Sequence, residues 1–504
     1  MRRAGLAVVA LLALPAPAAH ACPGPGWVGS WAASPSSASG GGQVTDLFGT
    51  SGDIKTPVRD STVRAILTPT LGGSTVRVHL SNRFGRVPVT FAQTAIARRA
   101  QGAALIAGTS TPVTFAGRRS VTAAPGRDVV SDPVGFAYEA FQPLAVSVYV
   151  SGDAGRPTEH YTARQTSFLT PEGAGDRVGN ADGGAFAAKT TTRPFVSRLE
   201  VMAPAATGAV VALGDSMTDG YQGQPPGGVP ETAEGIDADG RWPDVLGRRL
   251  RAAGVPLSVL NAGISGNRVL PTGPADGEGS HVYGPSALRR LDGDVLAQAG
   301  ATTVILLHGI NDLAEPPIAS VEALLAGYRS LIDRVHRAGL RVAQGTLTPA
   351  GGALNGGYGT AETEERRQAV NAWIRSASPA DAVVDFDAAV RDPSAPWRIH
   401  PAYDGGDHLH LNLAGYRAMG NAVPLSALAR AAPRRTLVLR VPRVYRRSTR
   451  RAEVLLGARR LARTRLRTIR LTLPAAPGAL AMRLRLHLRG GRVVTLRRTY
   501  AGCG

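Results

Sequence analysis

The chain predicts an α/β fold in which a helix-covered parallel β-sheet is flanked by an N-terminal β-sandwich and a small C-terminal β domain. Three observations support this prediction. Apolar and polar residues alternate with period two from Trp27 to about Thr207, strand-like runs alternate with helical patterns from Gly208, and period two returns after Ala431. A chain of 504 residues also exceeds what one hydrophobic core can organise, so several domains are expected.

The N-terminus predicts a secretory signal peptide over residues 1–21. Two arginines precede the apolar run Ala4–Ala18, and the small residues of Ala19–Ala21 supply a cleavage pattern before Cys22. Such a run is too short to persist as a membrane-spanning helix. We therefore expect an exported protein, against the alternative that the run forms a buried N-terminal helix.

Two cysteines, Cys22 and Cys503, stand near the two ends of the expected mature chain. Export would permit a disulfide between them. Cys22 also follows the predicted cleavage site directly, where a lipid could be attached, although Ala19 stands where lipoprotein signals favour a leucine-like residue. The sequence leaves a disulfide, lipid attachment and free thiols open.

Residues 22–207 predict the β-sandwich domain. The stretch STVRVHLSN alternates apolar and polar side chains from Val76 to Ser81, and LAVSVYVSG does so from Val146 to Val150. Turn clusters such as LGGS and SGDAGRP separate these runs, and no helical period persists between them. Two packed sheets are the simplest way to bury one face of each strand.

Residues 208–430 predict the helix-covered parallel sheet. One helical pattern runs from Trp242 to Leu250 before Gly254, and another runs from Val321 to Val335 before Gly339. Strands alternating with helices favour a parallel sheet covered on both faces, whose chemistry lies in loops at the carboxyl ends of the strands. The runs that predict strands are Val210–Leu213, Val255–Leu260, Thr303–Leu307, Arg341–Leu347 and Ala382–Phe386.

Ser216 lies in such a loop, within VVALGDSMTDG. A serine in this place commonly caps the next helix, whereas a nucleophilic serine needs a base, a group that orients the base, and donors for an oxyanion. Later loops supply these groups. NAGISGN contains Gly266 and LLHGIND contains Asn311, while YDGGDHLHLNLAGY contains Asp407 and His410 at a spacing that one turn can present together.

The blocks GDSMTDG, NAGISGN, GIND and DHLH make residues 206–430 resemble the SGNH, or GDSL-type, hydrolase family. The resemblance implies a three-layer flavodoxin-like sheet and no metal or organic cofactor. With a β domain in front, the chain is similar to the secreted xylanase-cluster type of esterase. Met217 replaces the usual leucine after the serine, and we expect its side chain to pack beneath the turn. The Gly- and Pro-rich insert Tyr221–Arg241 would form either a substrate-selecting rim or a tolerated surface loop.

The same resemblance implies roles for particular residues. Ser216 would be the nucleophile, His410 the base, and Asp407 the carboxylate that orients the base. The oxyanion hole would be formed by the backbone N–H groups of Ser216 and Gly266 together with the side-chain amide of Asn311. No metal ligand is implied.

A metal site is the alternative interpretation of the last block. Asp407, His408 and His410 are plausible ligands, and the two histidines would share one face if the segment were extended. No further ligand cluster is evident, so we favour the catalytic interpretation. His281 and His308 could line the pocket, although a hydrogen-bonded structural histidine is the simpler expectation for each.

Residues 434–504 predict a small β domain with a cationic outer face, preceded by a linker at Ala429–Arg435. AMRLRLHLRG has period two, and the segment from Ala431 to Gly504 holds 20 arginines against one acidic residue, Glu453. That segment accounts for +19 of the formal net charge of +20. Charge confined to one module favours an anionic cell-wall polymer over nucleic acid as partner, with a solvated face that binds nothing as the plain alternative.

Together these features predict a secreted serine ester hydrolase that works through an acyl-enzyme on acetyl or short acyl groups of carbohydrate. A lipid-directed esterase or lysophospholipase is the alternative within the same class. The rival from another class is a glycan- or cell-wall-binding protein with a vestigial hydrolase core. Four intact blocks argue against such decay.

Overall fold

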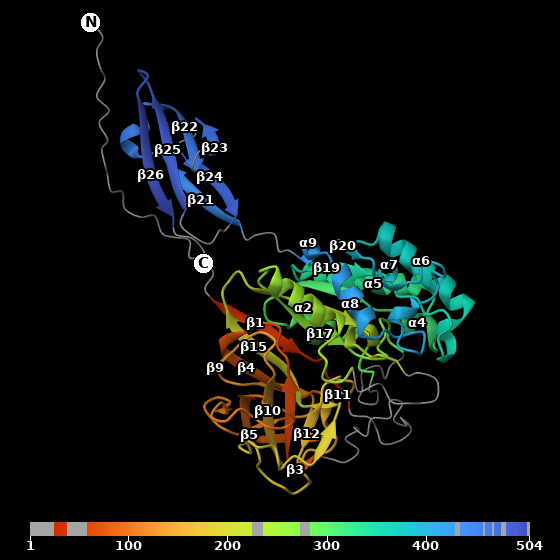
Figure 1. Cartoon of the computed structure of the whole chain (residues 1–504). Coiled ribbons are helices and arrows are strands. Elements are labelled where there is room, and N and C mark those ends of the chain that lie inside the picture. The colour runs from red at the N-terminus through yellow and green to blue at the C-terminus, as the bar shows by residue number, and fades with distance from the viewer. Residues whose placement is uncertain are drawn as a thin grey trace. The chain divides into compact units, whose positions relative to one another are not determined.

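The computed structural model describes residues 25–37, 58–223, 235–272, 283–428, 434–456, 459–465, 468–474 and 480–500. Two compact units divide the chain after Ala432, and each is described by itself (Figure 1). The predicted signal peptide, both cysteines and His281 lie outside the described residues. Among those residues no helix is long and apolar enough to cross a membrane. The boundaries drawn between the predicted domains stay predictions.

The first unit begins with antiparallel strands. They are β1 (Gly26–Ala32), β2 (Ser36–Ser37), β3 (Arg59–Leu67), β4 (Gly73–Asn82), β5 (Val89–Arg98), β6 (Thr111–Pro112), β7 (Val121–Ala123), β8 (Arg127–Val130), β9 (Val134–Tyr138), β10 (Leu144–Asp153), β11 (Thr158–His160), β12 (Ser167–Leu169), β13 (Ala188–Thr190), β14 (Arg193–Pro194) and β15 (Val196–Ala203). One sheet has the order β1-β15-β4-β8 with β9 beside β4, and the other has the order β13-β12-β3-β10-β5-β6 with β7 beside β5. Strands β14, β11 and β2 form a small third sheet.

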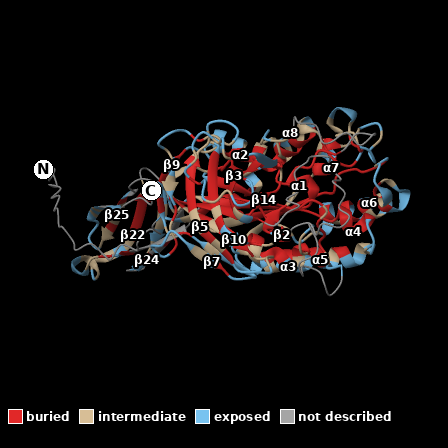
Figure 2. Ribbon diagram, turned by 90° about the horizontal axis from the view of Figure 1, so that it is seen from below, coloured by how far each residue is buried: buried red, intermediate tan, exposed pale blue. Residues whose placement is uncertain are grey.

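The two larger sheets bury their facing side chains in one hydrophobic core, which confirms the β-sandwich (Figure 2). Val76, Val78 and Leu80 of β4 point into this core, while Arg77 and His79 between them are only partly buried, as the period-two pattern predicts. The Val146–Val150 part of β10, which pairs with β3 and β5, is buried more evenly.

The second half of the unit is a five-stranded parallel sheet. Its strands are β16 (Gly208–Gly214), β17 (Leu257–Gly263), β18 (Ala301–Leu307), β19 (Arg341–Gly345) and β20 (Ala382–Val384). They lie in the order β17-β16-β18-β19-β20, the flavodoxin-like order in which the first strand is flanked by the second and third. Strands β19 and β20 end earlier than the apolar runs suggest, because Asp385 caps the next helix and accepts a hydrogen bond from the Thr346 hydroxyl.

Helices cover both faces of this sheet. They are α1 (Ser216–Asp219), α2 (Trp242–Ala252), α3 (Ala287–Leu291), α4 (Ile310–Ala314), α5 (Val321–Arg337), α6 (Ala361–Ala377), α7 (Phe386–Val390), α8 (Leu413–Ala422) and α9 (Leu425–Leu428). Val211 and Leu213 of β16 face the cluster built with α3, α5 and α6, while Val210 and Ala212 face the cluster built with α2, α7 and α8. Two cores on opposite faces confirm the three-layer α/β fold.

The sandwich packs directly against the α/β sheet within this unit. Strand β17 is an edge strand, and Thr70 occupies that edge by accepting the Val259 N–H at 2.9 Å and donating to the Val259 carbonyl at 3.1 Å. Ser258 Oγ donates to the Gly29 carbonyl of β1 at 2.6 Å. These contacts cover an edge that would otherwise be open to pairing with another chain.

The C-terminal unit is a small β domain. Its strands are β21 (Arg434–Arg440), β22 (Thr449–Leu456), β23 (Arg459–Thr464), β24 (Thr468–Pro474), β25 (Leu480–Leu488) and β26 (Val493–Tyr500). Strands β21 and β24 pair, and the others form a sheet in the order β23-β22-β25-β26. Met482, Leu484 and Leu486 face its core, which confirms the predicted alternation. The last two residues of the predicted linker, Arg434 and Arg435, already belong to β21, and its other residues lie outside the described chain.

Candidate active site

Strand β16 brings Ser216 to the carboxyl edge of the sheet. The strand is buried along its whole length, and Asp215 then caps α1 by accepting the Met217 N–H at 3.1 Å. Gly214 leaves no room for a side chain, because a Cβ there would lie 2.1 Å from Thr218 Oγ1. Met217 is buried in the core beneath the turn, as expected.

His410 and Asp407 lie against this serine. His410 Nε2 is 2.9 Å from Ser216 Oγ, and His410 Nδ1 is 2.7 Å from Asp407 Oδ2. Burial would raise the pKa of Asp407, but His410 and the N–H groups of Leu409 and His410 outweigh it and lower that pKa to about 2. An ionised carboxylate only accepts hydrogen bonds, so His410 Nδ1 carries the proton and the Nε2 lone pair faces the serine.

The first residues of the 221–241 insert frame this pair. The edge of the Tyr221 ring meets the His410 ring with centroids 4.6 Å apart. Gly223 has φ +81°, and a Cβ there would lie 2.6 Å from the Asp407 carboxyl carbon. The insert therefore begins as part of the site, although its residues 224–234 lie outside the described chain.

Gly266 and Asn311 follow the two strands that flank β16. Gly214, the last residue of β16, is paired with Gly263 of β17 and Leu307 of β18, so both following segments start level with the serine turn. Asn311 Nδ2 donates to the Asn267 carbonyl at 2.7 Å, which leaves its second amide hydrogen for another acceptor. The structure thus brings Ser216, Asp407 and His410 into contact and places Gly266 and Asn311 at the same sheet edge.

Tyr358 is a site residue that the sequence did not reveal. Its hydroxyl lies 2.7 Å from Asn311 Oδ1 and 2.7 Å from Glu315 Oε1. The hydroxyl has one hydrogen for these two acceptors, while the Asn267 carbonyl receives Asn311 Nδ2, so the Asn311 amide lies with its oxygen toward Tyr358. A single tyrosine in the glycine-rich stretch between β19 and α6 has no periodicity or motif that could have identified it.

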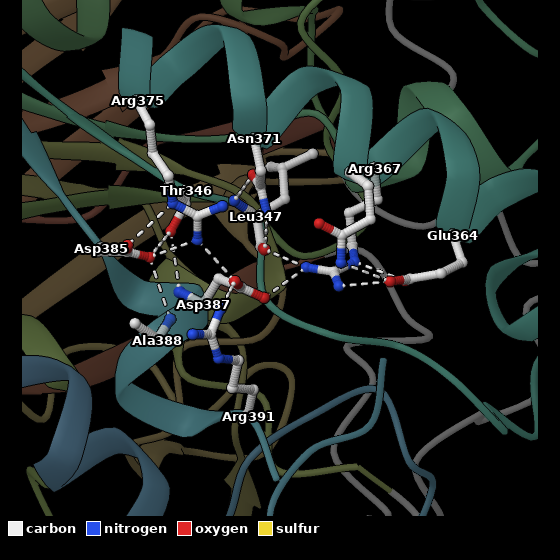
Figure 3. Close-up of polar contacts among 11 residues, drawn as sticks. Thr346, Leu347, Glu364, Arg367, Asn371, Arg375, Asp385, Asp387, Ala388 and Arg391 are labelled. Atoms are coloured by element: carbon white, nitrogen blue, oxygen red, sulfur yellow. Dashed lines mark hydrogen bonds and ion pairs between the residues drawn. The ribbon is translucent and has the colours of Figure 1, made fainter. Parts of the chain in front are cut away.

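Helix α6 anchors the segment that carries Tyr358. Asn371 bonds the backbone of Leu347 twice, accepting its N–H at 2.7 Å and donating to its carbonyl at 2.8 Å. Arg367 donates to the same carbonyl and to Asp387, and Arg375 and Arg391 also bond Asp387 (Figure 3). This buried ion-pair cluster ties the ends of β19 and β20 together beside the site.

Two further buried carboxyls lie near the serine. Burial raises the pKa of Asp215 to about 7 and that of Asp312 to about 6. Asp312 accepts the N–H groups of Val269 and Leu270, each at 2.9 Å, and so holds the segment that follows the NAGISGN block.

His408 does not share a face with His410, so the expectation from an extended segment is wrong. The chain bends there: His408 has φ +60°, and its Nδ1 contacts Asp404 Oδ2 instead. Within the described residues no group of three or more His, Cys, Asp or Glu side chains could hold a metal ion. His308 is buried, but neither ring nitrogen has a hydrogen-bond partner among the residues that the structure describes, so the expected bond is not found there. Burial and the neighbouring Arg290 hold the pKa of His308 well below its ordinary value.

Comparisons with known proteins give a family match and several similar solved structures. Residues 212–418 match the model of the GDSL-like lipase/acylhydrolase family. An aryl esterase from M. smegmatis is 19% identical with a TM-score of 0.33, covering 43% of this chain and 96% of that chain. A carbohydrate acetylesterase from Sinorhizobium meliloti is 17% identical with a TM-score of 0.33, covering 44% of this chain and 100% of that chain. A search of curated proteins finds no match.

The family match covers the segment in which the sheet, the serine turn and the histidine–aspartate loop meet. All four sequence blocks lie inside it. Residues 212–418 therefore match the GDSL-like lipase/acylhydrolase family over the whole segment that contains the candidate site.

Proposed function

We propose that the chain is a secreted serine esterase that removes acetyl or other short acyl groups from carbohydrate through an acyl-enzyme. One observation carries the chemistry: His410 bridges Ser216 Oγ at 2.9 Å and Asp407 at 2.7 Å. These distances lie in the range at which a base takes a proton from a nucleophile. Secretion rests on the signal-peptide pattern of residues 1–21.

The reaction follows from these positions. Ser216 Oγ attacks the ester carbonyl while His410 Nε2 takes its proton, and the negative charge on the carbonyl oxygen is received by the Ser216 and Gly266 N–H groups and the Asn311 amide. His410 then protonates the departing alcohol. Water repeats the sequence on the acyl-serine and releases the acid. Each oxyanion donor in comparable sites contributes about 3 kcal/mol of transition-state stabilisation.

Tyr283 supports a carbohydrate substrate. Its ring packs on Gly266, since a Cβ at that glycine would lie 2.4 Å from Tyr283 Cδ1. The residue is nevertheless 38% exposed. A flat, half-exposed ring beside an oxyanion donor offers a face on which a sugar ring can stack while its ester enters the site.

Acetate release from acetylated xylan tests the proposal, with a lysophospholipid and p-nitrophenyl acetate as competing substrates and Ser216→Ala as the inactive control. We expect acetate release and little lipid cleavage. Tyr283→Ala should raise KM for acetylated xylan while leaving p-nitrophenyl acetate unaffected, and Tyr283→Phe, which keeps the ring, should behave as wild type. Preferential lipid cleavage would favour the lysophospholipase alternative. Glycan binding without hydrolysis would favour the vestigial-core alternative.

We further propose that the C-terminal domain holds the enzyme on an anionic cell-wall polymer. Arg463, Glu453 and Arg485 lie in register across β23, β22 and β25, so Glu453 stands between arginines on one face. An arginine-rich face of this kind attracts a polyanion electrostatically.

Deleting residues 434–504 tests this second proposal. Turnover of p-nitrophenyl acetate should remain near wild type, because every proposed catalytic residue lies before the deletion. Retention on an anionic polymer column should weaken, and the wild-type retention should itself fall as salt is added. Equal retention of the two proteins would contradict the proposal.

A further inference from the structure

The Asp219 carboxylate lies three residues after Ser216 and joins two parts of the molecule. It is 1% exposed, at the end of α1. Its Oδ1 is 2.9 Å from His160 Nε2, and its Oδ2 accepts the Thr162 hydroxyl. Both partners belong to the N-terminal sandwich, at and just after β11. The carboxylate is thus held from outside the hydrolase domain.

On its other side Asp219 holds the loop that contains an oxyanion donor. Asp219 Oδ2 accepts the Ser265 N–H at 2.9 Å and the Ser265 hydroxyl at 2.8 Å. Ser265 directly precedes Gly266, which has φ +75°. Gly263, just before this loop, also touches α1, because a Cβ there would lie 2.3 Å from Asp219 N. The loop therefore has little freedom to move while Asp219 is held.

We call the contacts of Asp219 with His160, Thr162 and Ser265 the clamp. Its central group, the Asp219 carboxylate, is ionised. His160 Nδ1 lies 2.8 Å from the Ser34 carbonyl, which can only accept, so Nδ1 carries a hydrogen. Burial would raise the pKa of Asp219, but His160, Thr162 and Ser265 outweigh it and lower that pKa below its ordinary value. An ionised Asp219 can only accept hydrogen bonds from the groups around it. Hydrogen bonds to an ionised carboxylate are the stronger kind.

A second link from the sandwich reaches the other end of the same loop. Arg290, which is buried, donates to Ser34 Oγ at 3.2 Å, to the Gly214 carbonyl at 2.9 Å and to Asn267 Oδ1 at 2.9 Å. The Asn267 carbonyl in turn receives the Asn311 amide. Links from the sandwich therefore reach both chain neighbours of Gly266, namely Ser265 and Asn267.

We propose that the N-terminal sandwich completes the oxyanion hole: His160 and Thr162 hold Asp219, and Asp219 fixes Ser265 and with it the Gly266 N–H. This inference rests on the proposed function, because it needs Gly266 to receive the oxyanion. His160 and Thr162 are positioning residues: His160 acts through Asp219, and Thr162 acts through Asp219 and through its own contact with Ser265 Oγ. Oxyanion donors act only when their geometry is fixed before the reaction, so loosening this clamp weakens transition-state binding and leaves substrate binding intact.

The test is steady-state kinetics of His160→Gln on p-nitrophenyl acetate. We expect kcat to fall about tenfold to a hundredfold, less than the roughly 10²- to 10³-fold cost of removing a donor outright, with KM nearly unchanged. His79→Gln is the matched control. His79 belongs to the same sandwich, and its Nε2 lies 3.0 Å from Glu200, so the control removes a similar histidine–carboxylate pair that makes no contact with the loop. Its kcat should equal that of wild type.

Thr162→Val gives a second variant that keeps the side-chain shape and removes the hydroxyl, which contacts Asp219 and also Ser265 Oγ at 3.0 Å. For both variants the inhibition constant of a boronic acid, whose serine adduct places an oxygen in the oxyanion hole, should rise by the same factor as kcat/KM falls. A merely structural role would lower the melting temperature or the active fraction and would leave this constant unchanged. The double variant His160→Gln/Ser265→Ala should lose less than the product of the single losses.

The outcomes separate this inference from the proposed function. If wild type and His79→Gln hydrolyse the ester and Ser216→Ala does not, the proposed function stands. An unchanged kcat and boronate affinity in folded His160→Gln and Thr162→Val would then overturn the inference alone. An inactive wild-type chain would overturn both.

Discussion

Two aspartate–histidine pairs share one loop of this protein, and only one of them faces a nucleophile. In each pair the histidine Nδ1 contacts the aspartate Oδ2. The Asp407–His410 pair is buried, and its free nitrogen meets Ser216 Oγ. In the Asp404–His408 pair the histidine side chain is 48% exposed. A catalytic dyad is therefore defined by what the second imidazole nitrogen meets and by exclusion of water.

The outer pair has a local task of its own. Asp404 Oδ1 accepts the N–H groups of Gly406 at 2.8 Å and His408 at 3.1 Å, and Asp404 forms a β-bridge with Leu411. These bonds close the bend that carries Asp407 and His410. The outer pair thus shapes the loop, while the inner pair is placed for chemistry.

The largest effect is expected from removing the contact between His410 and Ser216, which distinguishes the inner pair from the outer pair. Ser216→Ala and His410→Ala should each lower kcat for p-nitrophenyl acetate by about 10⁴- to 10⁶-fold, and the double variant should be little worse, because the two residues act as a unit. Steady-state kinetics on folded proteins measures this. Multiplicative losses in the double variant would contradict a shared role.

Asp407→Asn should cost less, about 10²- to 10⁴-fold in kcat, because the amide can present an N–H to His410 and favour the wrong tautomer. Asp404→Asn is the matched control and should stay within a few-fold of wild type. With its pKa lowered to about 2, Asp407 is ionised above about pH 4, so its contribution to stability is present there and is lost as the pH falls toward 2. Denaturant melts between pH 5 and 2 should show a shallower decline in Asp407→Asn.

A smaller effect is expected for Tyr358→Phe, which changes the surroundings of Asn311, the proposed oxyanion donor. Losing one hydrogen bond to Asn311 leaves that amide less firmly oriented, and we expect kcat to fall about tenfold, the equivalent of roughly 1.4 kcal/mol, with KM little changed. Tyr328→Phe is the control, since that hydroxyl bonds the His308 carbonyl instead. Equal losses in both variants would indicate general destabilisation.

The smallest effect is expected for His408→Ala. This substitution removes an exposed side chain from the outer pair, so kcat should stay within about threefold of wild type and the melting temperature should fall only slightly. If His408→Ala were as damaging as His410→Ala while both proteins fold, the assignment of the base to His410 would be wrong.

Local patterns in the sequence were enough for most of the fold. Apolar periodicity predicts the five parallel strands, α2, α5 and the alternation in β4 and β25. The spacing of apolar residues along a helix or strand shows which of its faces is buried. The serine and the two flanking blocks were found because each stands directly after a strand, whereas the histidine and aspartate were found through the resemblance of their block to the GDSL-type family. The bend at His408 was missed, since a positive φ in a non-glycine residue leaves no periodic signal.

By itself, then, the sequence determined the secondary structure, the three-layer hydrolase core and the five residues proposed to act in catalysis. Only the tertiary structure decided that His410 and not His408 reaches Ser216, that Tyr358 orients Asn311, and that His160 of the sandwich holds Asp219. These contacts join residues 47 to 194 positions apart. No local pattern encodes such distances, because they are set by how the sheets and helices pack against one another.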